Sequence, residues 1–81
     1  MMKIKKNIAV SESGFVFDAG TGETYSLNPV GVEIVKLMNE GKNQEEISNY
    51  FLSNYEVSQG IFESAYFDFV SILNQYNLIE R

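Results

Sequence analysis

The chain has 81 residues, of which 44% are hydrophobic, and a formal net charge of −5. This length predicts one domain over residues 1–81, and six Phe and five Tyr can supply its core. Cysteine and histidine are both absent, which excludes a thiolate nucleophile, a Cys-based zinc site and the usual general base. These absences disfavour ordinary hydrolytic or transfer chemistry and leave an all-carboxylate site as the alternative; we expect no enzyme and no cofactor. The negative charge also disfavours binding to nucleic acid or to anionic membranes.

The first six residues are basic, but no apolar run follows them. Polar residues arrive too soon for a signal peptide, and no stretch approaches membrane-spanning length. We expect a cytoplasmic protein. Lys3, Lys5 and Lys6 are expected to form a frayed, solvated start.

The first third of the chain has the two-residue period of strands. Residues 7–11 are a candidate first strand, and Gly14 separates it from a second strand over residues 15–17. The small residues 19–22 supply a hairpin connection to a third strand over residues 23–27.

The third strand is short and polar on one side, which suits the edge of a small sheet. Tyr25 and Leu27 point to one face, and Thr24 and Ser26 point to the other. A sheet of three short strands cannot bury itself, so helices must cover one face.

A first helix is predicted from Pro29 to about Asn39. Asn28 is a favoured N-cap, and Pro29 suits the first helical position because it has no N–H to lose. Gly41 is placed to end the helix at the C′ position. Its apolar stripe consists of Val30, Ile34, Leu37 and Met38.

A second helix begins after Asn43. Asn43 and Glu46 form a capping-box pattern, in which each side chain bonds the other residue's backbone N–H. Ile47, Tyr50 and Phe51 supply the buried side of this helix.

Ser58 can cap a third helix that runs to about Tyr76. At 100° per residue, its apolar side chains fill an arc of about 180°. That arc is wider than the stripe of about 100° that one core requires, so we expect contact with a ligand or partner on one flank. Phe67 stands alone on the polar side, and Leu78 and Ile79 are expected to pack the tail onto the core. The arc contains Ile61, Phe62, Ala65, Tyr66, Phe69, Val70, Ile72, Leu73 and Tyr76.

This order predicts an α+β, winged-helix-like fold, in which a three-stranded antiparallel sheet is followed by three helices. The run Tyr25-x-Leu27-Asn28-Pro29-x-Gly31 after a hairpin resembles the PqqD-like family, also called RiPP recognition elements. The resemblance extends to Glu45-Glu46-Ile47, to Tyr55-Glu56-Val57 and to the closing Phe69, Leu73, Leu78 and Ile79 pattern. The chain departs from the family pattern at Asn77, where glycine is common, and at Ala65-Tyr66, where Asp-Val is common.

The resemblance implies a non-catalytic peptide chaperone. It would bind the leader segment of a ribosomally made precursor peptide by β-strand addition and present it to a maturation enzyme such as a radical S-adenosylmethionine protein. The leader would pair with the third strand and lie in a groove shared with the third helix. The implied contacts are Glu23, Thr24, Tyr25 and Ser26 on the strand, with Phe62, Tyr66, Phe69, Val70 and Leu73 on the helix.

Other interpretations remain open at this point. The helix aromatics can all be core residues, and the acidic residues can be a solvated face or can select a basic partner. A small structural or regulatory domain could homodimerise through the edge strand or the third helix, so either a monomer or a weak homodimer is expected. DNA binding is disfavoured because residues 43–77 contain no Lys or Arg. An enzyme is the third choice, which a pocket lined by several carboxylates would favour.

Overall fold

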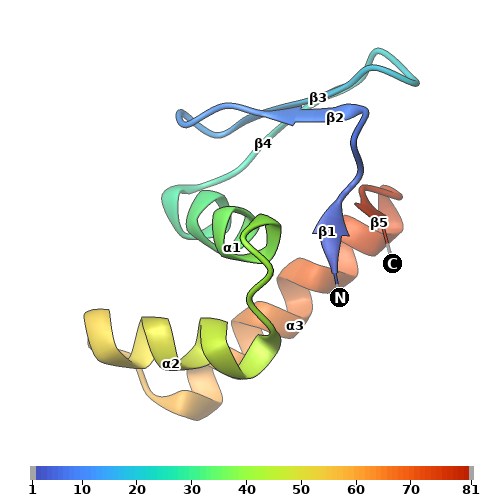
Figure 1. Ribbon diagram of the computed structural model, residues 1–81. Helices are drawn as coiled ribbons and strands as arrows, with labels where there is room; N and C mark the ends of the chain where they lie inside the picture. The colour runs from blue at the N-terminus through green and yellow to red at the C-terminus, as the bar shows by residue number, and fades with distance from the viewer. Residues whose placement is uncertain (1, 81) are drawn as a thin grey trace.

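A computed structural model describes residues 2–80. It confirms the predicted α+β fold: a three-stranded antiparallel sheet forms one layer, and the three helices lie beneath it (Figure 1). A short two-stranded ribbon, which the sequence did not predict, lies beside the end of the third helix (Figure 1). In chain order the elements are β1 (Lys3–Ile4), β2 (Ile8–Val10), β3 (Phe15–Asp18), β4 (Thr24–Ser26), α1 (Pro29–Asn39), α2 (Gln44–Asn54), α3 (Gln59–Gln75) and β5 (Ile79–Glu80).

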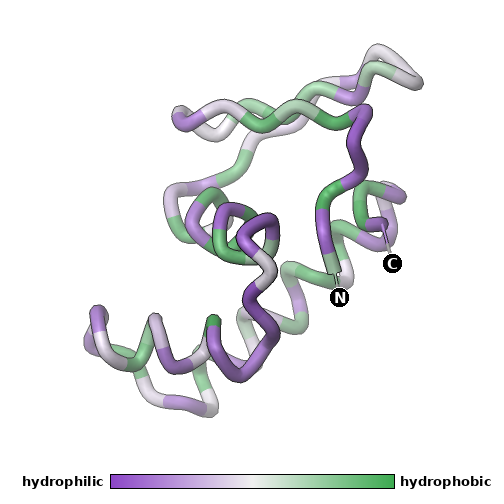
Figure 2. Tube along the Cα trace, viewed as in Figure 1, coloured by the Kyte–Doolittle hydropathy of each residue, from purple (hydrophilic) through white to green (hydrophobic). Residues whose placement is uncertain are grey.

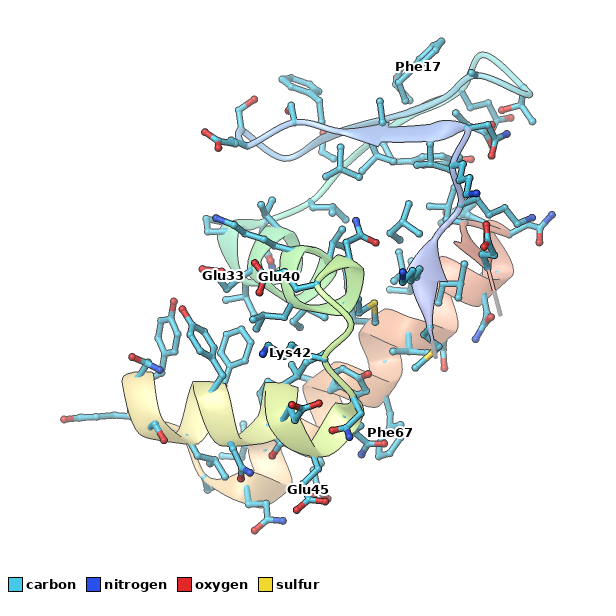
Figure 3. The ribbon with its side chains drawn as sticks, in the orientation of Figure 1. Phe17, Glu33, Glu40, Lys42, Glu45 and Phe67 are labelled. Atoms are coloured by element: carbon cyan, nitrogen blue, oxygen red, sulfur yellow. The ribbon has the colours of Figure 1, made fainter. Side chains whose placement is uncertain are left out.

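The sheet has the strand order β2-β3-β4, so β2 and β4 are its two edges. Successive side chains alternate between its faces: Val16 and Asp18 are buried toward the helices, whereas Phe15 and Phe17 are exposed on the outer face. Figure 3 shows Phe17 projecting away from the helical layer. The helices therefore cover one face of the sheet only.

The predicted helix starts are confirmed. The Asn28 side chain accepts from the N–H of Gly31 at 2.8 Å, and Pro29 occupies the first turn. At α2 the capping box is complete, because Glu46 N–H donates to Asn43 at 2.8 Å and Asn43 N–H donates to Glu46 at 3.0 Å. Local side-chain chemistry thus sets where these helices begin.

Left-handed residues end α1 and α3. Gly41 has a φ of 89° and Asn77 a φ of 59°, and each lies at the C′ position that follows its helix. The next N–H turns back to the helix in both cases; that of Leu78 donates to the carbonyl of Leu73 at 2.9 Å. Asn77 therefore does the work of the more usual glycine. The hydrophilic stretch from the end of α1 to the start of α2 is visible in Figure 2.

The buried side chains form one core cluster between the helices and the inner sheet face. The Phe51 and Phe62 rings stack at a centroid distance of 4.9 Å and join α2 to α3. Tyr66 is 1% exposed at the centre of α3, and Leu78 and Ile79 are buried as predicted. Between residues 2 and 80, every helix is too short or too polar to traverse a bilayer.

The expectation of a frayed N-terminal start is wrong. Lys3 and Ile4 pair with Glu80 and Ile79 in an antiparallel ribbon, and the Ile4 N–H donates to the Asn39 side chain at 3.2 Å. This ribbon buries Ile4 against α1. A basic, polar-looking start is ordered here because its partner lies at the other end of the described chain.

Candidate functional site

The outer edge of β4 offers unpaired main-chain groups. The Leu27 N–H donates to the carbonyl of Gly14, and the Asp18 N–H donates to the carbonyl of Glu23. Tyr25 lies midway between Glu23 and Leu27, so its main-chain groups also face β3. Hydrogen-bonded and non-hydrogen-bonded pairs alternate in an antiparallel ladder. The N–H and C=O groups of Thr24 and Ser26 therefore point away from the sheet, as those of an edge strand do.

The C-terminal half of α3 lies beside this edge. The Tyr25 and Tyr76 rings lie 4.7 Å apart between centroids, which joins β4 to the end of α3. The Phe69 ring lies so close to α1 that a Cβ added at Gly31 would come within 3.1 Å of it. Phe69, Ile72 and Tyr76 share one flank of the helix by their spacing. We call Thr24, Tyr25, Ser26, Phe69, Ile72 and Tyr76 the β4–α3 face.

Ile72 and Tyr76 supply the exposed apolar surface of this face. They are 49% and 46% exposed, although both belong to the wide apolar arc of α3. Ile61 continues the same flank toward the start of the helix and is 68% exposed. The excess width of the arc thus corresponds to a real uncovered flank.

The predicted helix contacts divide into two groups. Phe62, Tyr66 and Leu73 lie in the core at 4%, 1% and 2% exposure, so they present almost no surface to a ligand. Phe69 and Val70 are partly buried. Val70 lies about 120° round the helix from Tyr76, across the buried stripe from β4.

The predicted helix contacts therefore lie mostly at the centre of the arc, whereas Ile72 and Tyr76 lie at one of its margins. The centre of an apolar arc faces the core, whereas a ligand on the surface can reach only the margin. Ile72 and Tyr76 were visible in the arc, but periodicity alone does not say which margin lies beside the edge strand. The Tyr25–Tyr76 contact decides this question.

Glu23 gives the β4–α3 face a negative end. The Tyr25 hydroxyl donates to the Glu23 carboxylate at 2.5 Å. This hydrogen bond, with desolvation and the negative charge of Glu23, raises the pKa of Tyr25 from 10.0 to about 12. Residues 7–35 and 43–80, which include both sides of the face, contain no Lys or Arg.

We expect Glu23→Gln to lower the pKa of Tyr25 toward 10, because the substitution removes the carboxylate that holds the phenol proton. In the unmodified chain the raised pKa favours the folded state below pH 10, and this contribution is lost as the pH rises from 10 to 12. Ring ¹³C chemical shifts of Tyr25 measured against pH test the prediction. An unchanged Tyr25 pKa in Glu23→Gln would show that the hydrogen bond does not cause the shift.

The family model for coenzyme PQQ synthesis protein D (PqqD) matches residues 14–79. No curated protein is significantly similar to the chain in sequence.

Two solved structures have the same fold. A lasso peptide synthetase B1 complexed with the leader peptide is 20% identical, with a TM-score of 0.88 over 99% of this chain and 98% of the other. TbiB1 in complex with the TbiA(beta) leader peptide is 30% identical, with a TM-score of 0.85 over 96% of this chain and 94% of the other. Because the family model matches residues 14–79, which are most of the chain, the chain belongs to the PqqD family.

Proposed function

We propose that this chain binds the leader segment of a ribosomally made precursor peptide in the cytoplasm and presents it to a modifying enzyme. The observation that carries the proposal is the free edge of β4 beside the exposed flank of α3. It is supported by family membership and by the TbiB1 relative, which was solved in complex with a leader peptide.

An extended leader would add a strand to the sheet beside β4. Main-chain bonds to Thr24 and Ser26 would supply affinity with little dependence on sequence. Leader side chains on the inner side would contact Tyr25, Ile72 and Tyr76, where apolar residues are favoured.

The proposed site therefore differs from the set drawn from sequence. Phe62, Tyr66 and Leu73 would support the helix from the core, and Val70 would lie at the margin. Ile72 and Tyr76 join the contacts. The proposed contacts are Glu23, Thr24, Tyr25, Ser26, Phe69, Ile72 and Tyr76.

The chain itself would catalyse nothing. Its contribution would be proximity, because a precursor held beside an enzyme reacts at a raised effective concentration. The same surface could instead pair two copies of the chain through β4. The two functions are mutually exclusive at that edge.

An amide NMR titration with the short precursor peptides encoded beside the gene tests the proposal. We expect saturable shifts at Thr24, Tyr25 and Ser26 and along Phe69 to Tyr76. Sedimentation equilibrium of the same samples should show a monomer. A dimer whose β4 amides no precursor peptide perturbs would overturn leader binding in favour of self-association.

A further inference from the structure

The opposite edge of the sheet has a second strand-and-helix surface. The Ser11 N–H donates to the carbonyl of Phe15, and the Ala19 N–H donates to the carbonyl of Asn7. Ala9 and Phe17, which lie midway between these two bonds, are therefore a hydrogen-bonded pair of the ladder. By the alternation of the ladder, the N–H and C=O of Val10 point away from β3. Edge β2 therefore offers two unpaired main-chain groups at Val10.

A cavity of about 800 Å³ lies beside Val10, between the β2–β3 turn and the outer side of α1. Its apolar wall consists of Val10, Pro29, Val32 and Val35. This is the arrangement of the β4–α3 face repeated with α1 in place of α3: a free strand edge beside an apolar helix flank. We call it the β2–α1 groove. Because β2 and β4 are opposite edges of one sheet, the groove stays open when β4 is occupied.

The rim of the β2–α1 groove is acidic. Glu12 lies on the turn, Glu33 lies on α1, and Glu40 is the C-cap residue that follows α1; Lys36 is the basic residue among the described lining residues. Glu33 and Glu40 are seven positions apart and project from the same side of α1 (Figure 3). Among residues 2–80, these carboxylates form no group of three that could hold a metal ion. The three carboxylates outnumber Lys36, so the rim carries a net negative charge.

We propose that the β2–α1 groove docks an extended, basic segment of the modifying enzyme. The segment would bond to Val10 through its main chain and place apolar side chains on Pro29 and Val32, because Val35 is only 2% exposed. Its Lys or Arg residues would face Glu12 and Glu40, since opposite charges across a rim favour association. This inference rests on the proposed function, because a presenting module must hold its enzyme at a surface that the leader does not occupy.

Two model peptides test the chemistry of the groove on the ¹⁵N-labelled full chain. One is a short capped peptide of alternating lysine and valine, and the other alternates glutamate and valine. We expect the lysine peptide to give saturable amide shifts at Val10, Val32 and Lys36, and the glutamate peptide to give none. Sedimentation equilibrium without peptide should show a monomer.

Charge reversal then tests the rim. The double variant Glu12→Lys and Glu40→Lys should weaken the lysine peptide by about tenfold, from the loss and reversal of exposed ion pairs. Glu33 is left unchanged because it interacts with Tyr50: burial raises the pKa of that phenol, and Glu33 adds to the shift more strongly than Glu40 does. The matched control, Glu45→Lys and Glu56→Lys, makes the same change of net charge away from the groove and should weaken binding less than about twofold. Figure 3 shows Glu45 projecting from α2, apart from Glu33 and Glu40.

The purified modifying enzyme gives the final comparison. The Glu12→Lys and Glu40→Lys chain should lose enzyme affinity by about tenfold, while the leader shifts at Thr24 to Ser26 stay unchanged. Equal weakening by both double variants would overturn the proposal, since it would show an effect of net charge alone. Peptide shifts at β4 without shifts at Val10, or a dimer that buries Val10, would also overturn it. Failure of leader binding would instead refute the proposed function, and the titration of the β2–α1 groove with the two model peptides could still be interpreted.

Discussion

Replacing Ile72 with aspartate is expected to weaken leader binding by about fiftyfold or more. Ile72 is 49% exposed and lies one turn before Tyr76, whose ring contacts β4, so the fold does not depend on the full burial of Ile72. A bound leader would cover it, and the aspartate would lose that apolar contact and bury a charge. These two costs together are about 2–4 kcal/mol. Isothermal titration calorimetry with the leader peptide measures the loss.

Phe67→Asp is the matched control for this substitution. Phe67 is 51% exposed on the same helix, but its position is about 140° round the helix from Ile72. We expect leader affinity within about twofold of the unmodified chain, because Phe67 lies away from β4. A similar loss in both variants would place the leader elsewhere on α3 or show that α3 had been disrupted.

Replacing Gly14 with alanine is expected to destabilise the fold by about 3 kcal/mol or more. Gly14 has a φ of 98°, which L side chains rarely adopt, and an added Cβ would lie 2.3 Å from the carbonyl oxygen of Leu27. Both Gly14 and Leu27 would have to shift, and their backbone bond holds β4 to the hairpin. Strained backbone and a backbone clash each cost on the order of 1–3 kcal/mol. This is a large fraction of the stability of so small a domain. Urea denaturation followed by circular dichroism measures the change.

Gly22→Ala separates the clash from the backbone strain. Gly22 has a φ of 78°, but a Cβ there would meet nothing within 4 Å. Its expected cost is about 1 kcal/mol, from the left-handed conformation alone. If both variants lost the same stability, the close approach of Gly14 to Leu27 would have no energetic weight.

The boundaries of the elements could be predicted because their causes are local. Asn28, Asn43 and Ser58 cap the three helices with their own side chains, and Gly41 and Asn77 end α1 and α3 by their backbone conformation. The period of two in the strands and the apolar stripes of the helices likewise lie within single elements. The fold class follows, since a small three-stranded sheet needs helices on one face. The family resemblance depends on these same residues.

The candidate site could be predicted only in part. The residue pattern indicates an edge strand at Thr24 to Ser26 and a helix with more apolar surface than one core can cover. Which margin of that helix stays uncovered depends on how α3 packs against β4, a contact between residues some fifty positions apart. For the same reason Phe62, Tyr66 and Leu73 lie in the core while Ile72 and Tyr76 face solvent.

Two further features depend on the tertiary structure: the β1–β5 ribbon and the acidic β2–α1 groove. Each joins segments that are distant in the sequence, as the pairing of Lys3 with Glu80 shows most clearly. Local preferences of a chain specify its helices and strands, but they do not specify which strand edge packs beside which helix flank. That choice is made by the burial of apolar area across the whole core.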